Sequence, residues 1–161
     1  LINEFNFSNI AIVDFDVHHG NGTQDIFYNN KNVSYYSTHQ FPLYPGTGDF
    51  DEVGLGNIFN VPLVSGTNSD SYQKIFQKKI IDQLEIQQPD FLIISAGFDA
   101  HKDDPLANIN LNDQDFLIIT RKLKIIADKY CDGKVLSMLE GGYNINALEN
   151  AMISHIRELQ E

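Results

Sequence analysis

The sequence is poor in cysteine and in basic residues, and both shortages exclude classes of function. Its 161 residues include one cysteine, Cys131, so the chain can form no internal disulfide and offers no cysteine-based zinc site. Eleven lysines and arginines stand against 22 aspartates and glutamates, which gives a net charge of −11. This balance argues against binding to nucleic-acid phosphates or to anionic membranes, because both need clustered basic side chains. It is compatible with a cationic ligand, although an acidic surface is more commonly a solubility feature.

Long hydrophobic runs are also missing. No apolar stretch approaches the ~20 residues of a membrane-spanning helix, and the first nine residues, LINEFNFSN, lack the basic flank and apolar centre of a signal peptide. We therefore expect no membrane partner and a reducing, cytoplasmic setting. With 42% hydrophobic residues the composition is globular. Because no repeat and no Gly/Ser linker divides the chain, residues 1–161 are expected to form a single domain.

Short apolar runs alternate with helical patterns along the chain. Strands buried on both faces are predicted over residues 10–15, 33–36, 58–64, 91–95 and 135–139. One amphipathic helix is predicted over residues 70–84, and a second runs from an N-cap at Asn112 to a stop at Gly133. A third begins with a capping pair, Asn146 and Glu149, and reaches Leu159. Alternation of strands and helices predicts an α/β fold with parallel strands.

Polar, titratable or glycine-rich segments follow four of the five predicted strands. These segments are residues 14–22, 37–49, 96–101 and 140–143. The carboxyl ends of parallel strands meet at one edge of a sheet, where ligands bind. We therefore expect a functional site at this edge.

The first of these segments has the residues of a metal site. Asp14, Asp16 and His18 are spaced two residues apart, so their side chains are expected on the same side of the strand end. Two carboxylates and an imidazole suit a divalent ion, and Asp99 from another strand end can join them. Catalytic zinc sites use three protein ligands, which would leave one acid free to orient an imidazole. The alternative is that the acids cap turns and His18 is an ordinary loop histidine.

Residues 45–48 and 141–142 are glycine-rich but do not match a phosphate-binding pattern. No G-x-G-x-x-G sequence opens a helix after the first strand, and no lysine follows as in a P-loop. These segments can be tight turns that need a positive φ. Tyr143, which follows two glycines, suits a packing role as well as a catalytic one. Nucleotide binding is therefore not expected.

Four motifs occur in order and together carry a family resemblance. They are DFDVHHGNGT (residues 14–23), YPGTGD (44–49), SAGFDAH followed by DPL (95–106), and LEGGYN (139–144). This series resembles the zinc-dependent histone deacetylase family, in particular its bacterial and class II-like branch with acetylpolyamine amidohydrolases and acetoin-utilisation proteins. The resemblance extends from about residue 10 to the end of the chain. It implies the arginase/deacetylase fold, a three-layer α/β fold with a parallel sheet between helices on both faces.

The resemblance also implies roles for individual residues. Asp16, His18 and Asp99 match the family's zinc ligands, and Tyr143 matches the tyrosine that hydrogen-bonds the substrate carbonyl and its tetrahedral oxyanion. Tyr44 falls where the family places an aromatic wall of the acyl-lysine tunnel. The implied reaction is hydrolysis of an N-acetyl amide, of the acetyl-lysine or acetylpolyamine type, by a zinc-activated water.

Asp14 is implied in two further roles. It matches the acid that partners a catalytic histidine, and it also helps to hold a structural monovalent cation, K⁺ or Na⁺, with Ser37 nearby. The catalytic histidine itself has no counterpart, because the only His-His pair, His18-His19, belongs to the metal motif. In the family, a tandem-histidine pair in the N-terminal part supplies the general base and acid.

The chain is therefore interpreted as the C-terminal portion of a deacetylase-like catalytic domain, without the N-terminal strands of the fold. Two interpretations stay open: one half of a split enzyme that binds a separately encoded N-terminal fragment, or a truncated, catalytically impaired metal-binding remnant. An arginase-like two-manganese hydrolase would need more bridging carboxylates. We expect strand 10–15 to lie exposed or poorly covered, and hence self-association or tight binding of that fragment. We also expect slow turnover by the chain alone.

Overall fold

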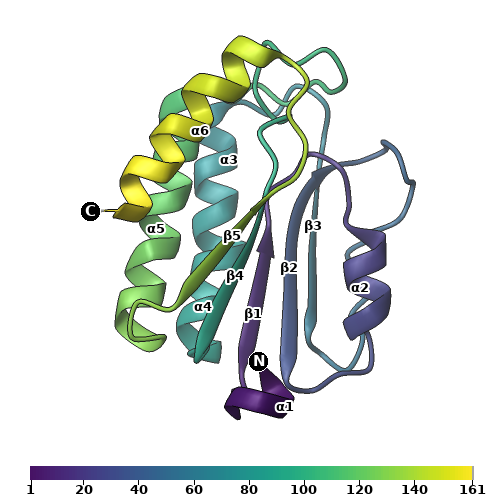
Figure 1. Cartoon of the computed structure of the whole chain (residues 1–161). Helices are drawn as coiled ribbons and strands as arrows, with labels where there is room; N and C mark the ends of the chain where they lie inside the picture. The colour runs from purple at the N-terminus through teal and green to yellow at the C-terminus, as the bar shows by residue number, and fades with distance from the viewer. Residues whose placement is uncertain (161) are drawn as a thin grey trace.

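The computed structural model describes residues 1–160, which form a three-layer α/β fold. The strands make one parallel sheet in the order β3-β2-β1-β4-β5. Figure 1 shows α3 to α6 against one face of this sheet and α2 against the other, so the predicted fold is confirmed. The strands are β1 (Ile10–Asp14), β2 (Val33–Gln40), β3 (Ile58–Leu63), β4 (Phe91–Ala96) and β5 (Val135–Leu139). The helices are α1 (Ile2–Phe5), α2 (Asn21–Phe27), α3 (Ser69–Phe76), the π-helical η1 (Gln77–Ile81), α4 (Asp82–Gln87), α5 (Asp113–Tyr130) and α6 (Ile145–Gln160).

Side chains at the helix starts explain two of the helix boundaries. The Asn112 side chain accepts a hydrogen bond at the start of α5 and forms a capping box with Asp115, as the sequence predicts for Asn112. The predicted capping pair of α6 is wrong. The Asn144 Oδ1 atom accepts hydrogen bonds from the backbone N–H groups of Asn146 and Ala147, at 3.1 and 3.2 Å. Because the helix begins at Ile145, Asn146 lies within its first turn and is not the cap.

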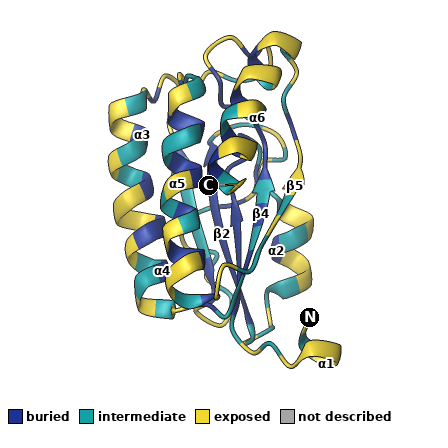
Figure 2. Ribbon diagram, turned by 60° about the vertical axis from the view of Figure 1, so that its left-hand side comes forward, coloured by how far each residue is buried: buried dark blue, intermediate teal, exposed yellow. Residues whose placement is uncertain are grey.

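Apolar side chains pack on both faces of the sheet. The larger cluster lies between the sheet and α3, η1, α5 and α6, and includes Val13, Phe76 and Phe116. The smaller cluster lies on the face of α1 and α2 and includes Ile12 and Tyr35. Alternate residues of β1 therefore enter different clusters, as expected of a strand buried on both faces. In Figure 2 the dark blue of buried residues runs along the sheet between the helical layers.

Strand β1 lies at the centre of the sheet, so the prediction that residues 10–15 are exposed is wrong. All five residues of β1 are buried, and β2 and β4 pair with it on either side. Sheet order is determined by how crossovers return the chain, which is why a strand near the start of the chain can be central. Ile2 and Phe7 also pack against the smaller cluster, which contains Ile10 and Ile12 of β1.

The edge strands are β3 and β5, and they differ in how well they could pair with another strand. Strand β3 contains Pro62, which has no amide hydrogen to offer to a further strand. Strand β5 contains no proline and exposes three apolar side chains, Leu136, Met138 and Leu139, to 46–58%. Self-association of the chain stays a prediction, now located at β5. Among residues 1–160, no helix has the length and hydropathy required to cross a lipid bilayer.

Candidate metal centre

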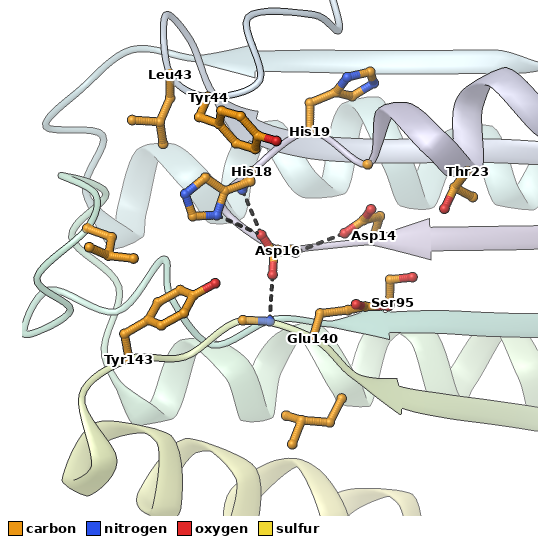
Figure 3. A pocket seen from close by; sticks show the side chains of 14 residues that line it. Asp14, Asp16, His18, His19, Thr23, Leu43, Tyr44, Ser95, Glu140 and Tyr143 are labelled. Carbon is orange, nitrogen blue, oxygen red and sulfur yellow. Dashed lines mark hydrogen bonds and ion pairs between the residues drawn. The ribbon is translucent and has the colours of Figure 1, made fainter.

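The carboxyl ends of β1, β4 and β5 open into a cavity of about 710 Å³ (Figure 3). Asp14 ends β1 and lies in register with Ser37 of β2 and Ser95 of β4, so the parallel pairing brings these strand ends together. The cavity is lined by Asp14, Asp16, His18, His19, Gly20, Thr23, Leu43, Tyr44, Ser95, Leu106, Leu139, Glu140, Gly141 and Tyr143.

Asp16, His18 and Asp99 converge beside this cavity. Each offers one possible ligand atom, and these atoms lie within 4.8 Å of one another. The His18 Nδ1 atom is 3.1 Å from Asp16 Oδ1 and 3.0 Å from Asp99 Oδ2. Asp99 is completely buried, whereas His18 is partly open to the cavity. The structure thus brings together the three residues for which the sequence predicts metal ligation.

Backbone amides hold the two carboxylates in place. Asp16 accepts hydrogen bonds from the N–H groups of His18 at 2.8 Å and Gly141 at 2.7 Å. The Asp99 Oδ1 atom accepts from the N–H of Val17 at 2.8 Å, which leaves its Oδ2 atom facing His18. Backbone hydrogen bonds from the loops that carry these residues therefore hold the triad in position. Hydrogen bonds of this kind orient metal ligands in proteins.

Two glycines make room for these carboxylates. A Cβ atom on Gly141 would overlap Asp99 Oδ2 and lie 2.6 Å from Asp16 Oδ2. A Cβ atom on Gly97 would lie 2.5 Å from Asp16 Cα. The sequence suggests a positive φ for the 141–142 turn. Gly142 has a positive φ, at 147°, whereas Gly141 is needed because the backbone there closely approaches the carboxylates of Asp16 and Asp99.

The electrostatics of the triad favour a positive charge. Hydrogen bonds to Asp16 and Asp99 raise the pKa of His18 to about 10. Burial opposes ionisation of Asp16, but the hydrogen bonds from His18 and Gly141 outweigh it and lower the pKa of Asp16. Burial raises the pKa of Asp99. Two carboxylates and an imidazole in a partly buried position form a donor set that suits a divalent cation.

Asp14 lies deeper than the triad. It is buried and accepts hydrogen bonds from the Tyr35 hydroxyl at 2.8 Å and the Asp16 N–H at 3.1 Å. Burial raises its pKa well above the ordinary value. Ser37 is buried on the neighbouring strand, where its hydroxyl hydrogen-bonds to His39 Nδ1 at 2.9 Å. The pairing of Asp14 with Tyr35 was not predicted, because Tyr35 lies inside an apolar run and carries no motif signal.

Two tyrosines face the cavity from different loops (Figure 3). The Tyr143 ring lies 6.4 Å from the His18 ring, and its backbone N–H donates to Asp104 Oδ2 at 2.8 Å. Burial, followed by the charges of Asp99 and Asp16, raises the pKa of Tyr143, so its hydroxyl is protonated at neutral pH. Tyr44 lies in the loop after β2 and is 79% exposed.

Several cavity residues were not singled out from the sequence. Thr23, Ser95, Leu106 and Glu140 line the wall, and all lie within or beside the four motifs. Their position next to predicted strand ends is the feature of the sequence that indicates a place in the cavity. His18 and His19 are the two cavity histidines among residues 1–160, and the ring nitrogens of His19 are hydrogen-bonded to Thr47 and Gln24.

Comparison with known proteins gives one consistent family. Residues 1–159 match the histone deacetylase domain family. The chain is 44% identical to "Type-2 histone deacetylase 2" of Dictyostelium discoideum, over 96% of this chain and 10% of that protein. It is 42% identical to a "Probable deacetylase" of Archaeoglobus fulgidus, over 86% of this chain and 40% of that protein.

A solved structure agrees. The crystal structure of the HDA15 HD domain superposes with a TM-score of 0.88 at 41% identity, covering 95% of this chain and 44% of that one. The chain thus spans less than half the length of each of these proteins. The matched sequence and the shared parallel sheet show that the chain belongs to the histone deacetylase family and has the arginase/deacetylase fold.

Proposed function

We propose that the chain provides the metal-binding part of a zinc-dependent active site that hydrolyses an N-acetyl amide of the acetyl-lysine or acetylpolyamine type. The observation that carries this proposal is the convergence of Asp16, His18 and Asp99 at an open cavity that Tyr143 also faces. Membership of a deacetylase family supports the class of reaction.

The donor set fits zinc. Catalytic zinc sites use three nitrogen or oxygen ligands from the protein and keep one position open, and Asp16, His18 and Asp99 would be those ligands. When bound, zinc polarises the substrate carbonyl and lowers the pKa of its water towards ~7. The backbone hydrogen bonds from Gly141 and Val17 keep the carboxylates oriented for this task.

In this proposal Tyr143 contacts the substrate, and Asp14 takes part in proton transfer. The protonated hydroxyl of Tyr143 would donate a hydrogen bond to the substrate oxygen, where negative charge develops in the transition state. Asp14 lines the same cavity and would orient an imidazole brought to it from another segment. We assign the tunnel wall to Tyr44, which lines the cavity from the opposite loop.

In this proposal, no cavity histidine among the described residues is free to act as the general base. His18 is a metal ligand in this proposal, and hydrogen bonds engage the ring nitrogens of His19. General acid–base catalysis typically contributes 10²–10⁴-fold, so the chain alone should turn over substrate slower by about that factor. The same observation favours a second candidate function, a metal-binding remnant without turnover.

Zinc analysis and turnover together test the proposal. The dialysed chain should retain about one zinc ion, as expected of a three-ligand catalytic site, and His18→Ala and Asp99→Ala should lose it. Zinc-loaded chain is then assayed on an acetyl-lysine peptide and on an acetylpolyamine, with and without an N-terminal deacetylase fragment that carries tandem histidines. Activity that appears with the fragment and is lost in Tyr143→Phe supports the proposal. Zinc binding without turnover under either condition supports the remnant, and unchanged zinc in both variants refutes the metal assignment.

A further inference from the structure

The loop of residues 41–49, between β2 and β3, carries one wall of the cavity. Leu43 and Tyr44 line the cavity from this loop. Tyr44 is 79% exposed, and within residues 1–160 its side chain makes no hydrogen bond or ring contact. The position of this wall must therefore be set by the backbone of the loop and by whatever anchors it.

Two buried histidines hydrogen-bond to the loop from the side of the sheet. The His19 Nδ1 atom lies 2.7 Å from Thr47 Oγ1, and the His39 Nε2 atom lies 2.9 Å from the carbonyl oxygen of Gly48. The two rings are in contact, with centroids 4.8 Å apart and their planes inclined by 49°. His19 is 4% and His39 1% exposed. One imidazole comes from the metal motif after β1 and the other from β2, so the pair joins the loop to the sheet.

The hydrogen bonds of His39 define its tautomer. Burial, together with the neighbouring His19, lowers the pKa of His39 to about 4, so the ring is neutral at pH 7. A carbonyl oxygen can only accept, so the His39 Nε2–H group donates to Gly48. Its Nδ1 atom then accepts from the Ser37 hydroxyl at 2.9 Å.

The same reasoning applies to His19. Gln24 donates its amide N–H to the Glu52 carboxylate, so its Oε1 atom faces His19 Nε2, which lies 3.0 Å away and donates to it. With the ring proton on Nε2, the Nδ1 atom is left as the acceptor. The Thr47 hydroxyl therefore donates to His19 Nδ1.

Gly48 completes the contact. Its φ is +90°, and a Cβ atom there would lie 2.6 Å from both His19 Cγ and His39 Nε2. The loop backbone thus rests directly on the two imidazoles, with no space for a side chain between them. The Glu52 carboxylate accepts from the Gly48 and Asp49 N–H groups, which ties the far end of the loop.

We propose that His19 and His39 are positioning residues: together they fix the 41–49 loop, and with it Tyr44, at a set distance from the candidate metal centre and so determine how tightly the carbon chain of the acetylated amine is held. The positions of the loop and the two rings follow from the contacts above, and the effect on the substrate's carbon chain rests on the proposed function. Neither ring needs to touch metal or substrate for this role.

Amide hydrogen exchange on the metal-free chain tests whether the two rings fix the loop. Thr47→Val keeps the shape of the side chain and removes the donor to His19. It should accelerate exchange of the 46–49 amides about fivefold, the factor that corresponds to one hydrogen bond of about 1 kcal/mol. Thr67→Val is the matched control, because it removes a hydroxyl bond to the Val64 carbonyl in a different turn and should leave the 41–49 loop unchanged.

His39 variants separate positioning from general stability. His39→Gln keeps an N–H that can reach the Gly48 carbonyl and should retain slow loop exchange, whereas His39→Leu should lose it. The chain has no tryptophan, so Tyr44→Trp gives a single fluorescent reporter, whose anisotropy should fall when Thr47→Val is added. In the fragment-complemented enzyme, Thr47→Val should raise KM about fivefold for the same loss of about 1 kcal/mol and leave kcat unchanged.

Three results would overturn the inference. Thr47→Val could leave loop exchange at the wild-type rate, exchange could accelerate equally across the sheet and helices, or His39→Gln could behave like His39→Leu. Failure of the proposed function has a different signature. A chain that binds no zinc and hydrolyses nothing would still show the loop-specific exchange, because that measurement uses neither metal nor substrate.

Discussion

Gly141→Ala is the most direct test of how the backbone supports the metal centre. The new methyl group would overlap Asp99 Oδ2 and lie 2.6 Å from Asp16 Oδ2, whereas ordinary contact begins at 3.4 Å. The oxygen of Asp16 must therefore move by the difference between 3.4 and 2.6 Å, about 0.8 Å. Gly141 has no positive φ, so backbone strain does not confuse the result.

A shift of this size matters because metal–ligand distances in proteins are held to within about 0.2 Å of their ideal values. The hydrogen bond from the Gly141 N–H to Asp16 would be disturbed at the same time. Changes in the groups that orient metal ligands typically weaken binding 10–100-fold, and we expect a loss in this range for zinc. In free energy this loss is about 1.4–2.7 kcal/mol.

The assay is a competitive zinc titration against a chromophoric chelator at pH 7, with Gly22→Ala as the control. A Cβ atom on Gly22 has no neighbour within 4 Å, so that variant should bind zinc like the wild type. Circular dichroism of each metal-free protein shows whether it is folded. Equal zinc affinity in a folded Gly141→Ala would refute the argument that close backbone approach shapes the site.

Three further outcomes are expected. Burial lowers the pKa of His155 from 6.5 to about 4, so as pH falls the unfolded chain binds the proton first and stability is lost between pH 6.5 and 4. The free energy of unfolding should be about 2 kcal/mol lower at pH 5 than at pH 7 because of His155. Urea unfolding at the two pH values should therefore show a smaller decrease in His155→Gln than in the wild type. An equal decrease would contradict the assignment. Met138→Lys places a charge on the exposed β5 edge and should lower the apparent mass in light scattering if the chain self-associates there, whereas an unchanged mass excludes β5 as the contact. Asn112→Ala removes the α5 cap and should lower the free energy of unfolding by about 1 kcal/mol, which urea titration at pH 7 measures; no change would mean that solvent replaces the cap.

The sequence predicted the parts of this protein that depend on local pattern. Apolar runs located the strands to within a few residues, and the rule that parallel strand ends share an edge brought Asp99 to Asp16 and His18 across more than 80 residues of chain. The cap at Asn112 followed from its place before a helical pattern.

What could not be predicted depends on tertiary packing. The apolar run of β1 predicts burial on both faces, but its place between β2 and β4 follows from how the crossovers return the chain, which its own residues do not indicate. Tyr35 looked like any core residue until the fold placed its hydroxyl on Asp14. His39 lies in the polar segment 37–49 that follows a predicted strand, but its contact with Gly48 exists only because the loop folds back over the sheet.

The two edges of the sheet differ in how well they can pair with a further strand. Pro62 interrupts the outer ladder of β3, whereas β5 presents an unbroken backbone and ends at Glu140, on the wall of the cavity. A further parallel strand would thus pair more completely beside β5 than beside β3, and its carboxyl end would then lie next to the cavity. In the proposed two-part active site, a segment that extends the sheet would therefore pair with β5 and reach the cavity from this flank.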